Sequence, residues 1–446
     1  MTTASETITL DLRGRKRALL GGFGLTNRAV AKALVERGHG VAAFDDKPNE
    51  LVGGFADELG IELLEPSAKL DKCLDQVDFV VPTPGLAEDH RVFELARQRG
   101  LPLVSEFDLA AQWDDRPVVA ITGTNGKTTV VELCTDALKR SGIKAVAAGN
   151  TDVPLVEAIR DHSTEVFVVE ASSFRLARTR EFTPQVGTWL NFAPDHLDVH
   201  LDLASYENAK SRIWRNLAVD GVCVANALDP VVMRHVRSDL RTVTFGGCQG
   251  DWRVAKGELT GPQGPFAHVA DLWRALPHDI EAALAVAASV TPVGATLDAV
   301  AAACHEFDGL PHRIVPIGEI DGSIYYDDSK ATTPHATLAA LRGFGQVVLI
   351  AGGQNKGVDL AEMAVEASGV VGVVAIGDAS GEIAGAFSAT HLVEVATDMD
   401  DAVTRARRFA RGGVPVLLSP GCASFDWYES YKKRGEDFIR AVGAQR

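Results

Sequence analysis

An apolar run at residues 118–122 leads directly into the turn Gly-Thr-Asn-Gly (123–126) and then into Lys-Thr-Thr (127–129). The run indicates a buried strand, and the glycines allow backbone N–H groups to converge on an anion at the start of a following helix. Lys127 adds a mobile positive charge, and the Thr128 hydroxyl suits Mg²⁺. The segment therefore predicts a strand, a phosphate-binding turn and a helix, which belong in an α/β sheet.

The spacing of this turn differs from that of the common phosphate loop. That loop has four residues between its first glycine and its Gly-Lys pair, whereas here only Thr124 and Asn125 intervene. An ordinary strand–turn–helix is the alternative interpretation. We favour a phosphate site because an apolar strand, glycines, a lysine and threonines coincide in register.

Strand-like runs alternate with helical patterns along almost the whole chain, beginning with residues 18–20, 28–37 and 41–44. This alternation is typical of parallel α/β domains. In the last third, apolar runs at residues 346–351, 369–376 and 414–418 indicate buried strands. Ligands of open α/β sheets lie beyond the carboxyl ends of strands, so we expect residues 352–356 and 419–421 near a ligand.

The length of 446 residues suggests about three domains. Residues 113–117 and 309–313 are rich in Pro, Gly and Asp and resemble linkers. We therefore predict three α/β domains in series, at residues 1–115, 116–309 and 310–446.

The formal net charge of −16 argues against nucleic acid or an anionic membrane surface as a partner. No apolar run approaches the roughly 18 residues of a membrane span, and the first residues lack a secretory signal. Six cysteines are scattered singly, which suits reduced thiols. We expect a cytoplasmic protein.

The segment 20–27 predicts a strand-to-helix turn, and the acidic pair Asp45-Asp46 follows at the distance typical of dinucleotide sites. Asn27 stands where the third glycine of that fingerprint would be. A nicotinamide oxidoreductase is therefore an alternative that rests on Gly-x-Gly alone.

Acidic and histidine side chains follow two further strands. The apolar run 166–170 ends in Glu170, which is placed as a second Mg²⁺ ligand downstream of a phosphate loop, or alternatively as a solvated acid at a strand end. Residues 189–200 contain Asp195, His196, Asp198 and His200, a cluster that suits metal ligation or an acid/base network. Lys210 lies in a helical stretch, and its spacing alone predicts a solvated surface residue.

Five motifs occur in one order: Gly-Thr-Asn-Gly-Lys-Thr-Thr (123–129), Glu-Ala-Ser-Ser-Phe (170–174), Asp-His-Leu-Asp (195–198), Tyr-Glu-Asn-Ala-Lys (206–210) and Leu-Pro-His-Arg (310–313). Together they resemble the Mur ligase family. The later runs Asp-Asp-Ser-Lys-Ala-Thr (327–332) and Leu-Ser-Pro-Gly-Cys-Ala-Ser-Phe-Asp (418–426) resemble the member that adds D-glutamate.

This resemblance implies a Rossmann-like N-terminal domain, a central P-loop ATPase-like domain and a Rossmann-like C-terminal domain. It also implies a peptidoglycan-forming ligase, which uses ATP to phosphorylate the carboxylate of UDP-N-acetylmuramoyl-L-alanine before the amine of D-glutamate attacks. Two Mg²⁺ sites are expected, with Mn²⁺ as an alternative, and the protein would be a monomer. A sister Mur ligase, a folylpolyglutamate synthetase and a protein that hydrolyses ATP without making a bond are the other interpretations.

The resemblance also implies roles for individual residues. ATP would be bound by Gly123, Thr124, Asn125, Gly126, Lys127, Thr128, Thr129, Arg313 and Asp328. The cations would be held by Thr128, Glu170, His196 and, if carbamylated, Lys210; of these, Glu170, His196 and Lys210 would be catalytic together with Lys127. The two substrates would be bound by Leu25, Thr26, Asp45, Asp46, Asn150, Ser172, Lys330, Thr332, Lys356, Ser424 and Tyr431.

One departure concerns the nucleotide. Ala282 stands where the family commonly has an asparagine that contacts adenine. We also expect the third domain to close over the second about residues 309–313, because an acyl phosphate must be shielded from water.

Overall fold

The computed structural model describes residues 12, 14, 16–64, 70–151, 153–197 and 199–445. Asp198 of the predicted acidic cluster lies outside these residues. The chain forms two compact units. One comprises Met1–Phe192, Val199–Ala267 and Ala283–Ala303, and the other comprises Ala193–Asp198, His268–Ala282 and Cys304–Arg446.

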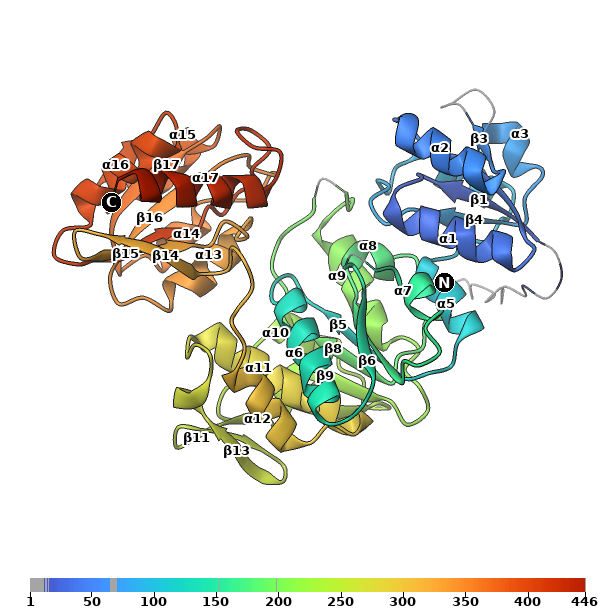
Figure 1. Cartoon of the computed structure of the whole chain (residues 1–446), viewed down its shortest axis with the longest axis horizontal. Coiled ribbons are helices and arrows are strands. Elements are labelled where there is room, and N and C mark those ends of the chain that lie inside the picture. The colour runs from blue at the N-terminus through green and yellow to red at the C-terminus, as the bar shows by residue number, and fades with distance from the viewer. Residues whose placement is uncertain are drawn as a thin grey trace. The chain divides into compact units, whose positions relative to one another are not determined.

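The first sheet of the larger unit is parallel and has the strand order β3-β2-β1-β4. Its strands are β1 (Arg17–Gly21), β2 (Gly40–Phe44), β3 (Glu62–Leu64) and β4 (Phe79–Pro82). Its helices are α1 (Leu25–Glu36), α2 (Glu50–Leu59), α3 (Leu70–Leu74) and α4 (Arg91–Gln98). The strand, turn and helix expected at the start of the chain are therefore present (Figure 1).

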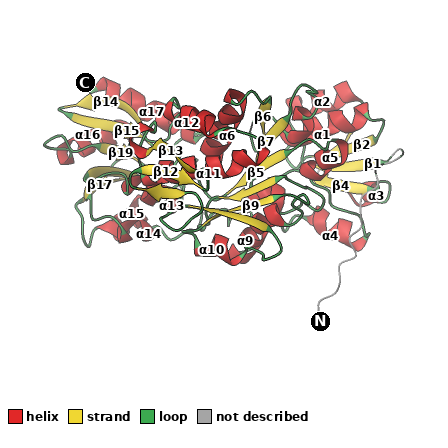
Figure 2. Ribbon diagram, turned by 90° about the horizontal axis from the view of Figure 1, so that it is seen from below, coloured by secondary structure: helices red, strands yellow, loops and turns green. Residues whose placement is uncertain are grey.

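The second sheet of this unit is also parallel, with the order β10-β9-β8-β5-β7-β6. Its strands are β5 (Val118–Thr122), β6 (Ala145–Gly149), β7 (Val166–Glu170), β8 (Val186–Trp189), β9 (Val222–Asn226) and β10 (Arg241–Phe245). The connecting helices are α6 (Lys127–Arg140), α7 (Leu155–Ala158), α8 (Ser173–Leu176), α9 (Leu203–Ser211), η1 (Arg212–Trp214) and α10 (Pro230–Arg234). Because β5 is central, the turn that follows it lies beside the ends of β7 and β8. Figure 2 shows β5 between β7 and β9.

A small three-stranded sheet and two helices follow β10. The strands β11 (Arg253–Ala255), β12 (Glu258–Gly261) and β13 (Gly264–His268) form the sheet, in which β11 and β12 are antiparallel. The segments η2 (Val269–Asp271), α11 (Pro277–Val290), η3 (Thr291–Val293) and α12 (Leu297–His305) come next.

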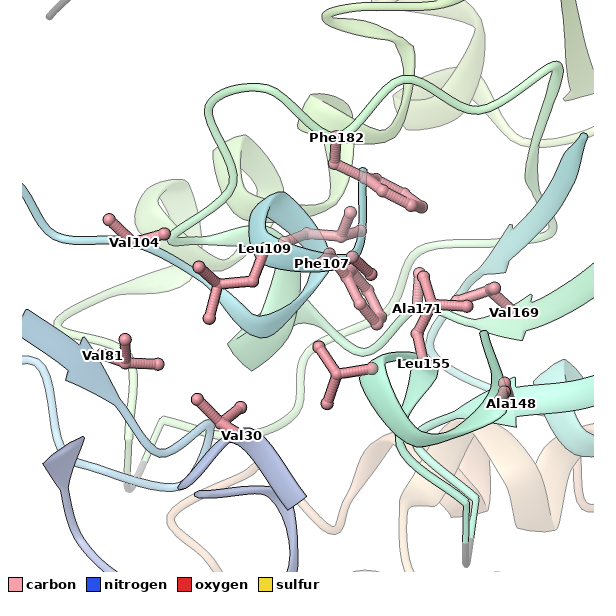
Figure 3. Packing of buried hydrophobic residues seen from close by; sticks show 14 of the residues in the cluster. Val30, Val81, Val104, Phe107, Leu109, Ala148, Leu155, Val169, Ala171 and Phe182 are labelled. Atoms are coloured by element: carbon pink, nitrogen blue, oxygen red, sulfur yellow. The ribbon is translucent and has the colours of Figure 1, made fainter. Parts of the chain in front are cut away.

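One hydrophobic core runs from the first sheet to the second through α5 (Glu106–Trp113). Figure 3 shows Phe107 and Leu109 of α5 among side chains from both sides, including Val30 of α1 and Val169 of β7. The predicted linker at residues 113–117 follows this helix, and Arg116 anchors it by donating to the carbonyls of Ile159, Asp161 and Thr164. The first two sheets therefore share one packed interior.

The sheet of the smaller unit has the order β14-β15-β19-β16-β17-β18. Its strands are β14 (Val315–Ile320), β15 (Ser323–Asp327), β16 (Val347–Gly352), β17 (Val370–Ile376), β18 (Val393–Val395) and β19 (Val416–Leu418). Only the pairing of β14 with β15 is antiparallel among the described pairings of this sheet. The three strands predicted from residues 346–376 and 414–418 are confirmed.

Successive residues of β16 face opposite sides of this sheet. Leu349 packs with Met363 and Ile383, whereas Val348 packs with Met399 and Phe438. One face is thus covered by α13 (Pro334–Leu341), α14 (Glu362–Val365) and α15 (Ser380–Phe387), and the other by α16 (Met399–Phe409) and α17 (Tyr431–Ala444). This two-sided burial explains why the strand sequence is apolar throughout.

The α/β fold class with three main sheets is therefore as predicted. The sheets lie within residues 1–115, 116–309 and 310–446, while the domain boundaries themselves stay a prediction. Within the described part of the chain, no helix is long and apolar enough to cross a membrane.

Candidate active site

The turn after β5 has the geometry of an anion-binding loop. Gly126 has a φ of 83° and immediately precedes α6, a left-handed conformation that favours glycine. Lys127 lies at the first turn of α6, and its Nζ donates to the carbonyls of Gly123 and Thr124, at 2.9 Å each. The ammonium group is thus held over the loop, where a phosphate would be met.

Asn191, which follows β8, braces the same loop. Its Oδ1 accepts from the amides of Thr124 at 3.0 Å and Asn125 at 2.9 Å, and its Nδ2 donates to the Asn125 carbonyl. The sequence analysis missed this residue, because only the sheet order brings β8 beside β5. Since Asn191 engages these two amides, any contribution of Thr124 or Asn125 to nucleotide binding would use their other atoms.

Glu170 lies at the end of β7, beside the loop. Its Oε2 accepts from the Thr128 hydroxyl at 2.8 Å, and its Oε1 accepts from Asn150 Nδ2 at 2.9 Å. Its side chain is buried, so the alternative of a solvated strand-end acid is wrong.

Hydroxyl and carboxylate oxygens are the donors that Mg²⁺ prefers, and Thr128 and Glu170 already lie at hydrogen-bonding distance. No group of three or more His, Cys, Asp or Glu side chains that could hold a metal occurs among the described residues. A cation here would therefore need phosphate oxygens as further ligands, as in other phosphate-loop sites. The residues present fit such a cation.

Lys210 is buried, with 1% of its surface exposed, and its Nζ donates to the carbonyl of Gly123 at 2.7 Å. The prediction of a solvated surface residue, made from spacing alone, is therefore wrong. Spacing failed because α9 packs against the phosphate loop, so a polar position of this helix faces the interior. Tyr206, one turn earlier, reaches the same loop through a 3.1 Å hydrogen bond between its hydroxyl and that of Thr124.

The two histidines of the predicted cluster have different surroundings. His196 belongs to the smaller unit, has a φ of 57°, and its Nε2 lies 3.2 Å from Asp195 Oδ2. His200 belongs to the larger unit and lies 3.0 Å from both Glu88 Oε1 and Ser173 Oγ. The role of His196 stays a prediction.

Burial lowers the pKa of His200, although Glu88 opposes this change. A neutral ring beside a carboxylate donates from Nδ1 to Glu88 and accepts at Nε2 from the Ser173 hydroxyl. His200 therefore joins the loop after β4 to the start of α8. Whether the residues of the predicted cluster form a metal site or an acid/base network stays a prediction.

The predicted substrate residues of the first sheet lie just after β1 and β2. Leu25 is exposed, and Thr26 Oγ1 accepts from Arg175 Nη2 at 2.9 Å. Asp45 accepts from the Phe23 and Lys47 amides, and Asp46 Oδ2 lies 3.3 Å from His90 Nε2. Asp45 thus holds the turn after β1 through the Phe23 amide.

Asn27 explains the missing third glycine of this turn. Its Nδ2 donates to the carbonyls of Gly21, Gly22 and Val81. The side chain thus ties β1 to β4 at the position where a dinucleotide fold has a glycine that allows the helix to pack closely on the strand.

Ser172 and Asn150 flank Glu170. Ser172 Oγ is buried and has no hydrogen-bond partner within the described residues. A buried polar atom of this kind usually marks a site for a ligand or water.

Further predicted residues lie in the smaller unit. The Asp328 carboxylate accepts from the Ser419 hydroxyl at 2.8 Å, and burial raises its pKa to about 7. Lys330 Nζ lies 3.9 Å from the centre of the Tyr431 ring. Ser424 is buried, and Thr332 and Lys356 are partly exposed.

Two arginines that the sequence analysis gave no role connect segments of the smaller unit. Arg274 donates to the carbonyls of Arg313 and Ile314, at 3.0 Å each, and pairs with Asp279. Arg434 is buried and donates to the carbonyls of Ser329, Cys422 and Ala423. These contacts join segments far apart in sequence, so no local pattern reveals them.

Comparison with known proteins gives full-length matches. Residues 121–272 match the family described as Mur ligase middle domain, and residues 312–422 match the Mur ligase, glutamate ligase domain. A UDP-N-acetylmuramoylalanine–D-glutamate ligase of Desulfosudis oleivorans is 36% identical over 444 residues, covering 96% of each chain. The protein of that name from Pelotomaculum thermopropionicum is 35% identical and covers 96% of this chain and 97% of its own.

Solved structures share the fold. The UDP-N-acetylmuramate-alanine ligase MurC from Thermotoga maritima matches with a TM-score of 0.59 and 20% identity, over 97% of this chain and 100% of its own. The MurF ligase from Thermotoga maritima in complex with ADP matches with a TM-score of 0.60 and 18% identity, over 97% and 96%.

Three α/β sheets with a phosphate loop after the central strand of the second define a protein of the nucleotide-dependent ligase architecture. The chain belongs to the Mur ligase family. The family resemblance drawn from the sequence motifs is confirmed.

Proposed function

We propose that this chain joins D-glutamate to UDP-N-acetylmuramoyl-L-alanine at the expense of ATP, a step of peptidoglycan synthesis. The relatives that match it over nearly their whole length carry this activity in their names. The observation in the structure that carries the proposal is the pairing of the Thr128 hydroxyl with Glu170 beside the loop that ends in Lys127. These groups would suit a γ-phosphate and its cation, beside which the carboxylate of the substrate would lie.

The first chemical step is transfer of the γ-phosphoryl group to the terminal carboxylate of the substrate, with release of ADP. Lys127 would stabilise the charge on the transferring group, because its ammonium lies over the loop. The α6 N-terminus would add its backbone N–H groups. The amine of D-glutamate then attacks the acyl carbon, and phosphate leaves as the amide bond forms.

Divalent cations would screen the repulsion between the phosphate and the carboxylate. Thr128, Glu170, His196 and a carbamylated Lys210 would hold the two cations. The burial of Lys210 beside the Gly123 carbonyl supports its involvement, because its side chain lies at the phosphate loop. Carbamylation would turn this cation into an anion that can meet a metal.

The smaller unit would bind the amino acid. Lys330 and Lys356 are cations suited to its two carboxylates, while Arg313 and Asp328 would reach the nucleotide. Ser424, Thr332 and Tyr431 would complete the pocket. The uridine end of the other substrate would lie at Leu25, Thr26, Asp45 and Asp46, with Asn150 and Ser172 facing its muramoyl part.

Phosphate release with Mg²⁺ and ATP tests the proposal, with each of the two other substrates omitted in turn. Release that requires both, together with a product heavier by one glutamyl residue, is the expected result. Release that requires a different amino acid or a different acyl substrate would favour a sister ligase or a folylpolyglutamate synthetase. Release that is indifferent to both would contradict the proposal and favour a protein that only hydrolyses ATP.

A cytoplasmic location and a monomeric state are part of the same proposal. The first follows from the cytoplasmic nature of the nucleotide substrates. Sedimentation of the purified chain would check the second.

A further inference from the structure

Arg175 and Glu106 form a buried ion pair in the larger unit. Arg175 Nη1 lies 2.6 Å from Glu106 Oε2, and the two side chains are 6% and 4% exposed. Glu106 begins α5, whereas Arg175 lies on α8, the helix that follows Glu170 and Ser172. The other carboxylate oxygen, Oε1, accepts from the Val156 amide at 2.8 Å. The pair therefore fixes α8 against α5 and α7.

The second terminal nitrogen of Arg175 points to the first sheet. Nη2 donates to Thr26 Oγ1 at 2.9 Å, and Thr26 lies in the first turn of α1. One rigid guanidinium thus connects the turn after β1 with the segment that carries Glu170. The planar fork of arginine allows this connection in two directions, which the single point charge of a lysine does not reproduce.

A buried ion pair is a weak source of stability, because desolvation offsets the attraction between the charges. Apolar side chains would fill the same space at no greater cost. The polar contact adds a directional constraint: if the turn at Thr26 shifts relative to α8, a buried N–H loses its acceptor, which is unfavourable. The distance between the two segments is therefore set by a hydrogen bond as well as by packing.

We propose that Arg175 is a positioning residue that sets the span between the uridine-binding turn at Thr26 and the carboxylate-activating end of β7. This inference rests on the proposed function, which puts the two ends of one long substrate at these two places. The enzyme would thereby select a substrate whose nucleotide and carboxylate are separated by the length of the muramoyl unit. Arg175 itself need not touch the substrate.

The test compares Arg175→Lys with the double variant Arg175→Gln/Glu106→Gln. The lysine keeps the charge but cannot serve both acceptors, and the double variant removes both buried charges together. Arg116→Lys is the matched control, because Arg116 also pairs with a carboxylate, Asp114, and lies over a phenylalanine ring, yet contacts neither Thr26 nor α8. For each, KM values for both nucleotides, kcat, thermal unfolding and the affinity for UDP alone are measured.

We expect both Arg175 variants to raise KM for UDP-N-acetylmuramoyl-L-alanine about tenfold, as one lost hydrogen bond would. KM for ATP and the affinity for UDP alone should stay within about twofold of the wild type, since neither depends on the span. The double variant should unfold at a temperature closer to that of the wild type than Arg175→Lys does. Its KM for UDP-N-acetylmuramoyl-L-alanine should nevertheless stay raised.

Two results would overturn the inference. One is a KM that follows thermal stability across all three variants, Arg116→Lys included, which would mean a structural role only. The other is an affinity for UDP alone that falls as much as that for the whole substrate, which would limit Arg175 to shaping the local turn. Failure of the wild-type enzyme to form the glutamyl product would instead contradict the proposed function, so the two failures are distinguishable.

Discussion

The hydroxyl of Thr128 donates to Glu170 Oε2 over 2.8 Å, which joins the first turn of α6 to the end of β7, the neighbour of β5. The two residues are far apart in sequence, and the parallel pairing of β5 with β7 brings them together. Hydroxyl and carboxylate oxygens are donors that Mg²⁺ prefers, so these two side chains would help to hold a divalent cation that stabilises the transferring phosphoryl group. Because they already lie together, we expect the loss of either one to be costly in the transition state.

Glu170→Gln should lower kcat by about a hundredfold or more, because the neutral amide is a poor ligand for a divalent cation while it keeps the hydrogen bond from Thr128. The dependence of the rate on Mg²⁺ concentration should shift to higher concentration. Glu165→Gln is the control, since Glu165 is exposed just before the same strand and accepts from the Lys144 amide. Equal kcat values for Glu170→Gln and Glu165→Gln would contradict the assignment of Glu170 as a metal ligand.

Lys127→Ala should cost on the order of 3 kcal/mol in transition-state stabilisation, a loss of roughly a hundredfold in rate. The reason is that its ammonium lies over the loop, at 2.9 Å from two of its carbonyls. Steady-state kinetics with saturating substrates measures the change. Lys139→Ala, at an exposed position of the same helix, should leave the rate unaltered, and near-normal turnover of Lys127→Ala would contradict the phosphate-loop assignment.

Asp328 should make stability depend on pH. Burial raises the pKa of its carboxyl from 3.8 to about 7, while the Ser419 hydroxyl and Arg313 oppose the rise. Between these values the folded chain holds a proton that the unfolded chain has released. The free energy of unfolding should therefore fall as pH rises from about 4 to about 7, by about 4 kcal/mol in total.

Asp328→Asn should remove this loss and stabilise the smaller unit above pH 7. Urea unfolding at pH 5 and pH 8 measures it, with the exposed Asp378→Asn as the control. If the free energy of unfolding differs between pH 5 and pH 8 by the same amount in Asp328→Asn as in the wild type, the pH dependence belongs to other groups.

The strands and the motifs could both be recognised in the sequence, because each depends on neighbouring residues. Glu170 is an example, since a carboxylate at the end of an apolar run is placed at a sheet edge by the strand itself. The contacts that hold such residues are not local. Asn191 reaches the phosphate loop only because β8 lies beside β5, and Arg175 reaches Thr26 only because the first two sheets share one core.

Lys210 is a residue for which the prediction from spacing failed because its contacts are not local. Its position on α9 is polar by sequence, and helical periodicity has no information on which polar position is turned inward. Packing of α9 against the phosphate loop decides this, and the lysine is buried. The motif order, rather than the spacing, was the signal that could find it.

Lys210→Ala should abolish activity, with a loss of more than about a hundredfold, if a carbamylated Lys210 meets the second cation. Added formate or acetate should restore part of the activity, because a small carboxylate can occupy the space that the side chain leaves beside the Gly123 carbonyl. The same acids should not raise the rate of Lys127→Ala, whose defect is a missing positive charge. Absence of any rescue, in a variant whose thermal unfolding matches that of the wild type, would argue for an unmodified lysine that holds the Gly123 carbonyl. Full activity without added acid would exclude Lys210 from the reaction altogether.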